Sequence, residues 1–318
     1  MHARDAVVTV NELPRPAPPA RWFARFAAFL LCYLLFVIVF GAWVRVTGSG
    51  AGCGDHWPTC HGDLVPRSPS AQTLIEYTHR LTSGVLGVMA LALPLWAWRR
   101  FPSGHPVRRY SAATLALVLV EAAIGAGLVL RELVAQNASR ARAVVVAVHL
   151  TNTLLLTACA VLTVAFAQAP AWASARKRRL GAGDALLGFF CLGLMVAAAS
   201  GAVTALGDTL FPVHSLAGSP EPPADHFLVQ LRVLHPLLAC GVVALAGAVS
   251  WRFARVPECR RWAQAVGILA GTQLVLGGLN IGLSAPGSLQ LAHLFLAQLL
   301  WMGAVLLWWS WRRSSPAV

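Results

Sequence analysis

The chain has 318 residues, of which 57% are hydrophobic and only 12% are charged. Soluble domains carry about 25% charged residues, so this chain has too few polar groups to cover its apolar surface in water. It is therefore predicted to lie in a membrane. The formal charge of +13 would by itself suggest a nucleic-acid partner, but the placement of the basic residues excludes that class.

Eight apolar segments follow one another along the chain, each of roughly 20 residues or more, enough to cross a hydrocarbon core of about 30 Å. They are expected at 24–46, 73–98, 109–131, 143–168, 183–206, 228–251, 262–283 and 288–311. The first segment is too long for the core of a signal peptide and no small-residue cleavage site follows it, so it is expected to remain as a span. The predicted fold class is an all-α integral membrane protein with eight transmembrane helices.

The basic residues gather on one side of these spans. That side holds 18 of the 25 Lys and Arg residues: Arg4, Arg15, Arg21, Arg25, Arg99, Arg100, Arg108, Arg109, Arg176, Lys177, Arg178, Arg179, Arg252, Arg255, Arg260, Arg261, Arg312 and Arg313. The opposite loops hold Arg67, Arg131, Arg140 and Arg142. Because positively charged loops stay in the cytoplasm, both termini are predicted to be cytoplasmic. The positive charge is thus explained by membrane topology, and no nucleic-acid partner is expected.

A weak internal repeat relates the first four spans to the last four. "LVEAAIGAGLVL" in the third span resembles "GTQLVLGGLNIGL" in the seventh, and "FGAWVRVTGSG" in the first echoes "ASGAVTALGD" in the fifth. Because four is even, both halves begin on the same side. The repeat predicts two tandem four-helix bundles, related by a pseudo-two-fold axis along the membrane normal. The expected parts are a cytoplasmic disordered tail (1–23), an N-terminal bundle (24–168), a cytoplasmic linker (169–182), a C-terminal bundle (183–311) and a cytoplasmic tail (312–318).

The repeat aligns His79 with His235 and His149 with His293. All four lie about five to seven residues into an even-numbered span, roughly 8–10 Å below the outer boundary at 1.5 Å per residue. Single histidines in a bundle can be structural, but two matched pairs at one depth are typical of haem, with one imidazole on each side of the iron. Zinc or copper would normally require a third or fourth ligand, and none is duplicated in both halves.

The two halves differ beside these histidines. Glu76 precedes His79 by three residues and shares its helix face, whereas the aligned position in the second half is Arg232. A guanidinium near haem would pair with a propionate and suit a permanently held cofactor, while a carboxylate could accept protons or stabilise a cationic intermediate. The pattern favours one reacting pocket and one supporting pocket. The alternative for Glu76 is a structural ion pair with Arg80 or Arg45.

The first outer loop reads "TGSGAGCGDHWPTCHGDLVP". Cys53 and Cys60 lie on the oxidising side of the membrane, where a disulfide is the first interpretation. The alternatives are a metal site with His56 and His61, or a redox-active thiol pair. The remaining cysteines are interpreted as packing residues.

Taken together, these residues resemble the haem A synthase family of bacteria and mitochondria. The resemblance covers about residues 24–311 and rests on "GAWVRVTGSGAGCGDHWPTCHG", "EYTHR", "VHLTNTLLL", "LHPLLA" and "LAHL". It implies a bacterial cytoplasmic-membrane enzyme, with its haem sites toward the outer face, that oxidises a ring methyl of haem O to the formyl group of haem A.

Carried onto this chain, the resemblance implies that His79 and His149 ligate the substrate haem O. It implies that His235 and His293 ligate haem B, that Glu76 is catalytic, and that Cys53 and Cys60 are the family's outer-loop pair. Arg232 is expected to contact the haem B cofactor. The expected partners are haem O, a haem O synthase, an electron donor, membrane lipid and, as an option, a second copy of the chain.

One departure concerns the 207–227 loop, which has no cysteine although several bacterial members carry a second pair there. A disulfide relay between the halves is therefore not expected, and His214 and His226 in this loop are interpreted as surface residues. Two other functions stay open: a dihaem b-type cytochrome that transfers electrons from quinol, and a transporter built from two repeats. Glu121, aligned with Gln273, has no role in any of these interpretations.

Overall fold

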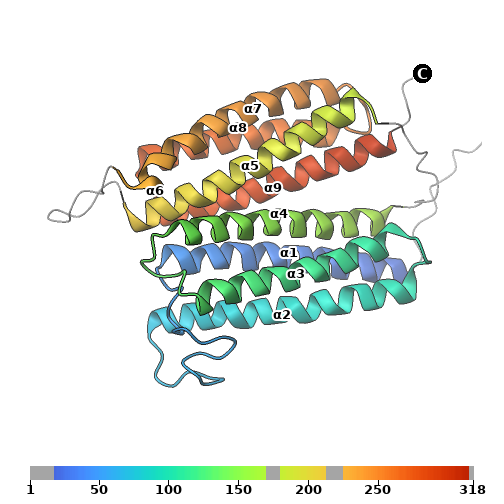
Figure 1. The fold of residues 1–318 in the computed structure, drawn as a ribbon. Coiled ribbons are helices and arrows are strands. Elements are labelled where there is room, and N and C mark those ends of the chain that lie inside the picture. Colours follow the sequence, from blue (N-terminus) through green and yellow to red (C-terminus); the bar gives the residue numbers. More distant parts are fainter. Residues whose placement is uncertain (1–17, 170–179, 213–224, 315–318) are drawn as a thin grey trace, which may run out of the picture.

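The computed structural model describes residues 18–169, 180–212 and 225–314. Within these ranges the chain is helical and contains no strand (Figure 1). The helices are α1 (Pro18–Val46), α2 (Ala71–Arg100), α3 (Pro106–Leu130), α4 (Arg140–Gln168), α5 (Ala182–Leu210), α6 (Phe227–Gln230), the 3-10 turn η1 (Leu231–Val233), α7 (Leu234–Phe253), α8 (Arg260–Gly282) and α9 (Gly287–Arg313). Several predictions concern segments outside the described residues: most of the N-terminal tail (1–17), most of the 169–182 linker, His214, and residues 315–318 of the C-terminal tail.

Eight helical segments are long and apolar enough to cross a membrane, with α6, η1 and α7 forming the sixth. They confirm the eight predicted spans within a few residues, and the protein is a multi-pass membrane protein. The largest difference is at the start, because α1 begins at Pro18 instead of residue 24. Proline is tolerated in a first helical turn, where its missing N–H has no partner to lose.

The helices pack as two groups of four. In the first group α1 contacts α2, α2 contacts α3, α3 contacts α4, and α4 contacts α1. In the second group α5, α7, α8 and α9 make the corresponding ring of contacts. Figure 1 shows the two groups one above the other, with α4 next to α5 and α9. The division into two four-helix bundles and their pseudo-two-fold relation both stay predictions.

The two groups are held together by apolar packing with a few polar contacts inside it. Leu154 of α4 packs in the same core as Trp301 of α9, whose indole Nε1–H donates to the Leu154 carbonyl at 2.7 Å. Near it, the Thr157 hydroxyl donates to Gln298 Oε1 at 3.2 Å. Both α4 and α9 carry a candidate histidine, so this interface places the two predicted sites next to each other.

Serine caps set where two of the histidine-bearing helices begin. Ser70 accepts from the Thr73 N–H at 3.1 Å before α2, and Ser139 accepts from the Arg142 N–H at 3.2 Å before α4. Such caps satisfy otherwise unpaired N–H groups in the first turn. The residues 47–70 lie at the same end of the bundle as these caps and α6, and we call this the loop end (Figure 1).

Candidate functional site

The four histidines lie at similar depths from the loop end. His79 is the ninth residue of α2, His149 the tenth of α4, and His293 the seventh of α9. His235 is the second residue of α7, preceded without interruption by α6 and η1. The helices start slightly earlier than the sequence predicts, so the imidazoles lie about 9–14 Å along their helices at 1.5 Å per residue.

The rings of His235 and His293 lie close to one another in the second group of helices. Their helices, α7 and α9, are opposite members of the ring of contacts. The centres of the two imidazole rings are 6.3 Å apart and the ring planes are inclined by 86°. A metal–imidazole bond is about 2 Å long, and each ring centre lies about 1 Å beyond its bonding nitrogen. Two imidazoles on opposite sides of one iron would therefore have centres about 6 Å apart, which this pair matches.

His79 and His149 occupy the corresponding helices of the first group, α2 and α4. Both residues line the same cavity. The Nδ1 atoms of His79, His149 and His293 are buried without a hydrogen-bond partner among the described residues. These ring nitrogens are therefore not held in place by hydrogen bonds from the described protein groups.

Glycines on neighbouring helices leave space for three of the imidazoles. A Cβ atom on Gly201 of α5 would lie 2.8 Å from Cε1 of His235, and one on Gly41 of α1 would lie 3.1 Å from Cε1 of His79. A Cβ atom on Gly277 of α8 would lie 3.3 Å from Cε1 of His293. Gly41 and Gly201 occupy matching positions in two repeated segments of the sequence. This repeat could have predicted that each glycine lies beside a histidine of the neighbouring helix.

All four histidines line one cavity of about 2030 Å³ that extends through both groups of helices. Small-molecule pockets usually measure about 300–1,000 Å³, so this cavity can hold two large ligands. Most of its lining is apolar, and it reaches the surface that lipid would cover. In the first group that opening includes Val88 of α2 and Leu119 of α3, with exposed fractions of 71% and 61%.

Glu76 is buried, with 4% of its surface exposed, and it forms an ion pair with Arg80. Its Oε2 accepts from the backbone N–H of Cys53 at 2.9 Å, and its Oε1 accepts from Arg80 Nε at 3.1 Å. The structural alternative for Glu76 is thus present with Arg80. Glu76 also lines the cavity with His79. The ion pair does not test the catalytic role of Glu76, which stays a prediction.

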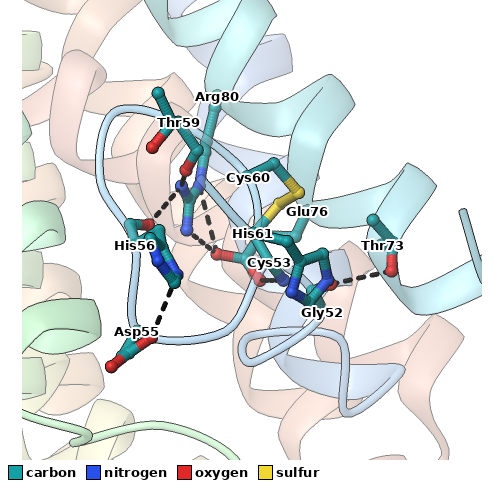
Figure 2. Close-up of polar contacts among 10 residues, drawn as sticks. All are labelled: Gly52, Cys53, Asp55, His56, Thr59, Cys60, His61, Thr73, Glu76 and Arg80. Carbon is teal, nitrogen blue, oxygen red and sulfur yellow. Dashed lines mark hydrogen bonds and ion pairs between the residues drawn. A yellow bond between two sulfur atoms is a disulfide. The ribbon is translucent and has the colours of Figure 1, made fainter. Parts of the chain in front are cut away.

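The 47–70 loop is anchored to the start of α2 by a small network (Figure 2). Arg80 Nη1 donates to the carbonyls of His56 at 2.7 Å and Thr59 at 2.6 Å. The predicted disulfide between Cys53 and Cys60 is formed, and both residues are fully buried. The disulfide and the Glu76–Arg80 pair therefore hold the loop over one edge of the cavity.

The metal alternative for this loop gains no support. His61 Nε2 lies 2.9 Å from the Gly52 carbonyl, and His56 Nδ1 lies 3.0 Å from Asp55 Oδ1 (Figure 2). In the part of the chain that the structure describes, no group of three His, Cys, Asp or Glu residues is arranged to hold a metal ion. Paired imidazoles for a haem iron need no third protein ligand.

Arg232 in η1 lines the cavity but is already engaged by protein groups. Its Nε lies 2.8 Å from Asp208 Oδ1, and its Nη2 donates to the carbonyls of Gly207 at 2.9 Å and Phe211. The sequence pattern predicted a propionate partner and did not identify Asp208. Contact with a haem propionate would have to be shared with this ion pair, and it stays a prediction.

Arg45 of α1 is a further residue that sequence reasoning assigned only as a candidate partner of Glu76. Instead it reaches into the second group of helices. Its guanidinium donates to the Ala205 carbonyl at 2.8 Å, to Thr209 Oγ1 and to Gln290 Oε1 at 2.9 Å. Arg45 therefore joins α1 to α5 and α9 at the loop end of the cavity.

Comparisons with known proteins identify the family of the chain. The family described as "Cytochrome oxidase assembly protein" matches residues 24–305. "Protoheme IX farnesyltransferase" of Thermus thermophilus is 47% identical over 289 residues, covering 88% of this chain and 46% of that protein. "Heme A synthase" of Alkalihalophilus pseudofirmus is 41% identical over 96 residues (30% of this chain, 32% of the relative), and that of Exiguobacterium sibiricum is 38% identical over 104 residues (33% and 35%). The chain thus spans about half the length of the Thermus relative.

Proposed function

Because the chain belongs to the COX15-CtaA family of cytochrome oxidase assembly proteins, we propose that it is a haem A synthase. The reaction is the successive hydroxylation of a ring methyl of haem O, first to an alcohol and then to an aldehyde hydrate that loses water; each hydroxylation removes two electrons from the methyl carbon and adds one oxygen atom, with molecular oxygen or another external two-electron acceptor as the oxidant. The product, haem A, serves terminal oxidases. The enzyme acts in a bacterial cytoplasmic membrane, with both termini in the cytoplasm and the loop end facing outward.

The observation that carries this proposal is the arrangement of the histidines. One apolar cavity contains two imidazole pairs at similar depth, and the 6.3 Å separation in the C-terminal pair fits ligands on opposite faces of one iron. The glycines that leave space for three of the rings fit the same use. The heme A synthases matched by parts of this chain support the reaction class.

We assign the substrate to the N-terminal bundle and the resident cofactor to the C-terminal bundle. His79 and His149 ligate haem O, and the opening at Val88 and Leu119 lets its isoprenoid tail stay in lipid. His235 and His293 hold haem B, which supplies electron transfer to the substrate site when bound.

Glu76 is the proposed catalytic carboxylate. Hydrogen bonds from the Cys53 N–H and from Arg80 hold the carboxylate in place at the cavity wall. From there it stabilises positive charge that develops at the reacting carbon, or accepts the proton released there. Its low exposure strengthens such an electrostatic effect, because little water is present to screen it.

The test compares Glu76→Gln with Arg80→Gln. Membranes containing each variant are supplied with haem O, and extracted pigments are separated and quantified by chromatography. The proposal expects Glu76→Gln to keep both haems while haem A formation falls by about 100-fold or more, the range for losing a positioned acid–base group. Arg80→Gln breaks the same ion pair but leaves the carboxylate, so a smaller loss is expected. Normal haem A production by Glu76→Gln, or equal loss in both variants, would remove Glu76 from the reaction.

Two other activities are separated by the same pigment analysis. A dihaem electron-transfer cytochrome would contain two equivalent permanent haems and neither haem O nor haem A. A farnesyltransferase activity is suggested by the name of the Thermus relative, and it would convert haem B and farnesyl diphosphate to haem O. More than half of that relative lies outside the match, which supports a haem O synthase as a partner of this chain more than as its own activity.

A further inference from the structure

Glu121 is a carboxylate within the membrane-spanning part of α3, and the sequence patterns left it without a role. It lines the cavity. Two side chains of α4 donate to it: Asn152 Nδ2 to Oε2 and the Thr153 hydroxyl to Oε1. Asn152 also donates to the Leu117 carbonyl at 3.1 Å. Since both carboxylate oxygens receive a donor, Glu121 is held as a hydrogen-bond acceptor at a fixed place between α3 and α4.

This fixed carboxylate faces one of the proposed ligands. Glu121 Oε1 lies 3.5 Å from His149 Nδ1. An N–H···O hydrogen bond spans about 2.7–3.2 Å, so a side-chain adjustment of a few tenths of an ångström completes a bond between them. The Nδ1 atom of His149 has no other partner among the described residues.

The other three proposed ligands have different surroundings at Nδ1. His235 Nδ1 lies 3.0 Å from the Ala197 carbonyl and 3.2 Å from the Ser200 hydroxyl, which are neutral groups. No partner of His79 Nδ1 or His293 Nδ1 is present in the described part of the chain. Of the four, only His149 has a carboxylate at this nitrogen in the described structure.

The position in the second bundle that aligns with Glu121 carries no charge. The residue aligned with Glu121 is Gln273, whose Nε2 donates to the backbone carbonyl of His293 at 3.0 Å. The two halves therefore use the same helix position differently. In α8 a neutral amide contacts the backbone of the histidine-bearing helix, whereas in α3 a carboxylate faces the imidazole itself.

We propose that Glu121 is a positioning residue that accepts a hydrogen bond from Nδ1–H of His149. This bond fixes the imidazole tautomer, leaves Nε2 for the substrate iron, and makes the ring a stronger electron donor. A stronger donor favours the ferric state, so the N-terminal site has a lower reduction potential than it would have with a neutral residue at position 121. The inference rests on the proposed function only in taking His149 as a haem ligand.

The experiment measures reduction potentials instead of turnover. Purified protein with haem B is reconstituted with haem O, and both haems are titrated spectroelectrochemically in the wild type, Glu121→Gln and Thr153→Val. Glu121→Gln places the residue of the second bundle in the first. We expect it to raise the ferrous-to-ferric ratio of the haem O site about tenfold at a given potential, which corresponds to about 59 mV for one electron. The potential of haem B in the same molecule should not change.

Thr153→Val provides an independent test with the opposite sign. Its hydroxyl, which also lies 2.9 Å from the His149 carbonyl, and His149 Nδ1 approach the same oxygen of Glu121. Removing the hydroxyl leaves that oxygen to the imidazole and should lower the haem O potential. The charge control is Glu132→Gln, which removes an exposed carboxylate beyond the end of α3 and should shift neither potential.

The outcomes separate this inference from the proposed function. If His149→Ala binds haem O as the wild type does, His149 is not a ligand and the site assignment fails. If haem O binding needs His149 but Glu121→Gln leaves its potential unchanged, the positioning role of Glu121 is wrong. If Glu121→Gln does not accumulate, Thr153→Val decides: a lowered potential supports the inference, and an unchanged or raised potential overturns it.

Discussion

Replacing Gly201 by alanine is expected to displace His235 and to deplete haem B. The new Cβ atom would lie 2.8 Å from His235 Cε1, whereas ordinary contact begins at about 3.4 Å. The ring must therefore move by about 0.6 Å, or α5 must move away from α7. Ligand distances at a metal site are tolerated within about 0.2 Å, and displaced surroundings of a ligand typically weaken metal affinity 10- to 100-fold.

The assay is haem B content per mole of purified protein, measured by the pyridine haemochrome spectrum during titration with haem B. The matched control is Gly188→Ala on the same helix, where an added Cβ meets no atom within 4 Å. His235→Ala defines complete loss of the ligand. Affinity for haem B in Gly201→Ala equal to that of Gly188→Ala would refute the argument, because a ring that moves 0.6 Å without consequence does not hold the iron.

Two further predictions concern the connections outside the spans. Replacing both Cys53 and Cys60 by serine should lower the free energy of unfolding by about 2 kcal/mol, the loop-entropy contribution of a bridge across 7 residues. The 47–70 loop should then be cleaved faster by added protease. An unchanged rate of cleavage would contradict this prediction. Burial lowers the pKa of His105 below its ordinary value of 6.5, and its Nδ1 also accepts from the Val107 N–H at 3.2 Å before α3. Because the unfolded chain binds this proton more readily, stability is present above about pH 6.5 and falls on acidification. His105→Gln should flatten the dependence of the melting temperature on pH between 5 and 7, and an identical slope in both proteins would refute this cause.

Features that depend on residues near one another in the sequence could be predicted from the sequence. The apolar segments had to become helices, because a chain in lipid must satisfy its backbone hydrogen bonds within each segment. The similar depth of His79, His149, His235 and His293 followed from counting residues along those helices. Cys53 and Cys60 lie close in sequence in one loop, and their pairing needed no distant element.

The partners of the charged residues were less accessible to sequence reasoning. Glu76 with Arg80 was one of two structural alternatives, and the structure chose the partner four residues away on the same helix. Arg232 pairs with Asp208 of α5, a residue that no sequence pattern had singled out. Arg45 crosses to α5 and α9. These contacts depend on how each helix is rotated and tilted against its neighbours, which hydropathy does not encode.

The sequence by itself determined the membrane class, the eight helices and the level of the four histidines, since hydrophobicity and residue spacing act along one helix at a time. Only the tertiary structure decided what each functional group faces: His235 toward His293 across the second bundle, Gly201 against His235, and Glu121 toward His149. The physical reason is that side chains on separate helices meet only after the helices pack, and a small rotation of one helix exchanges one partner for another.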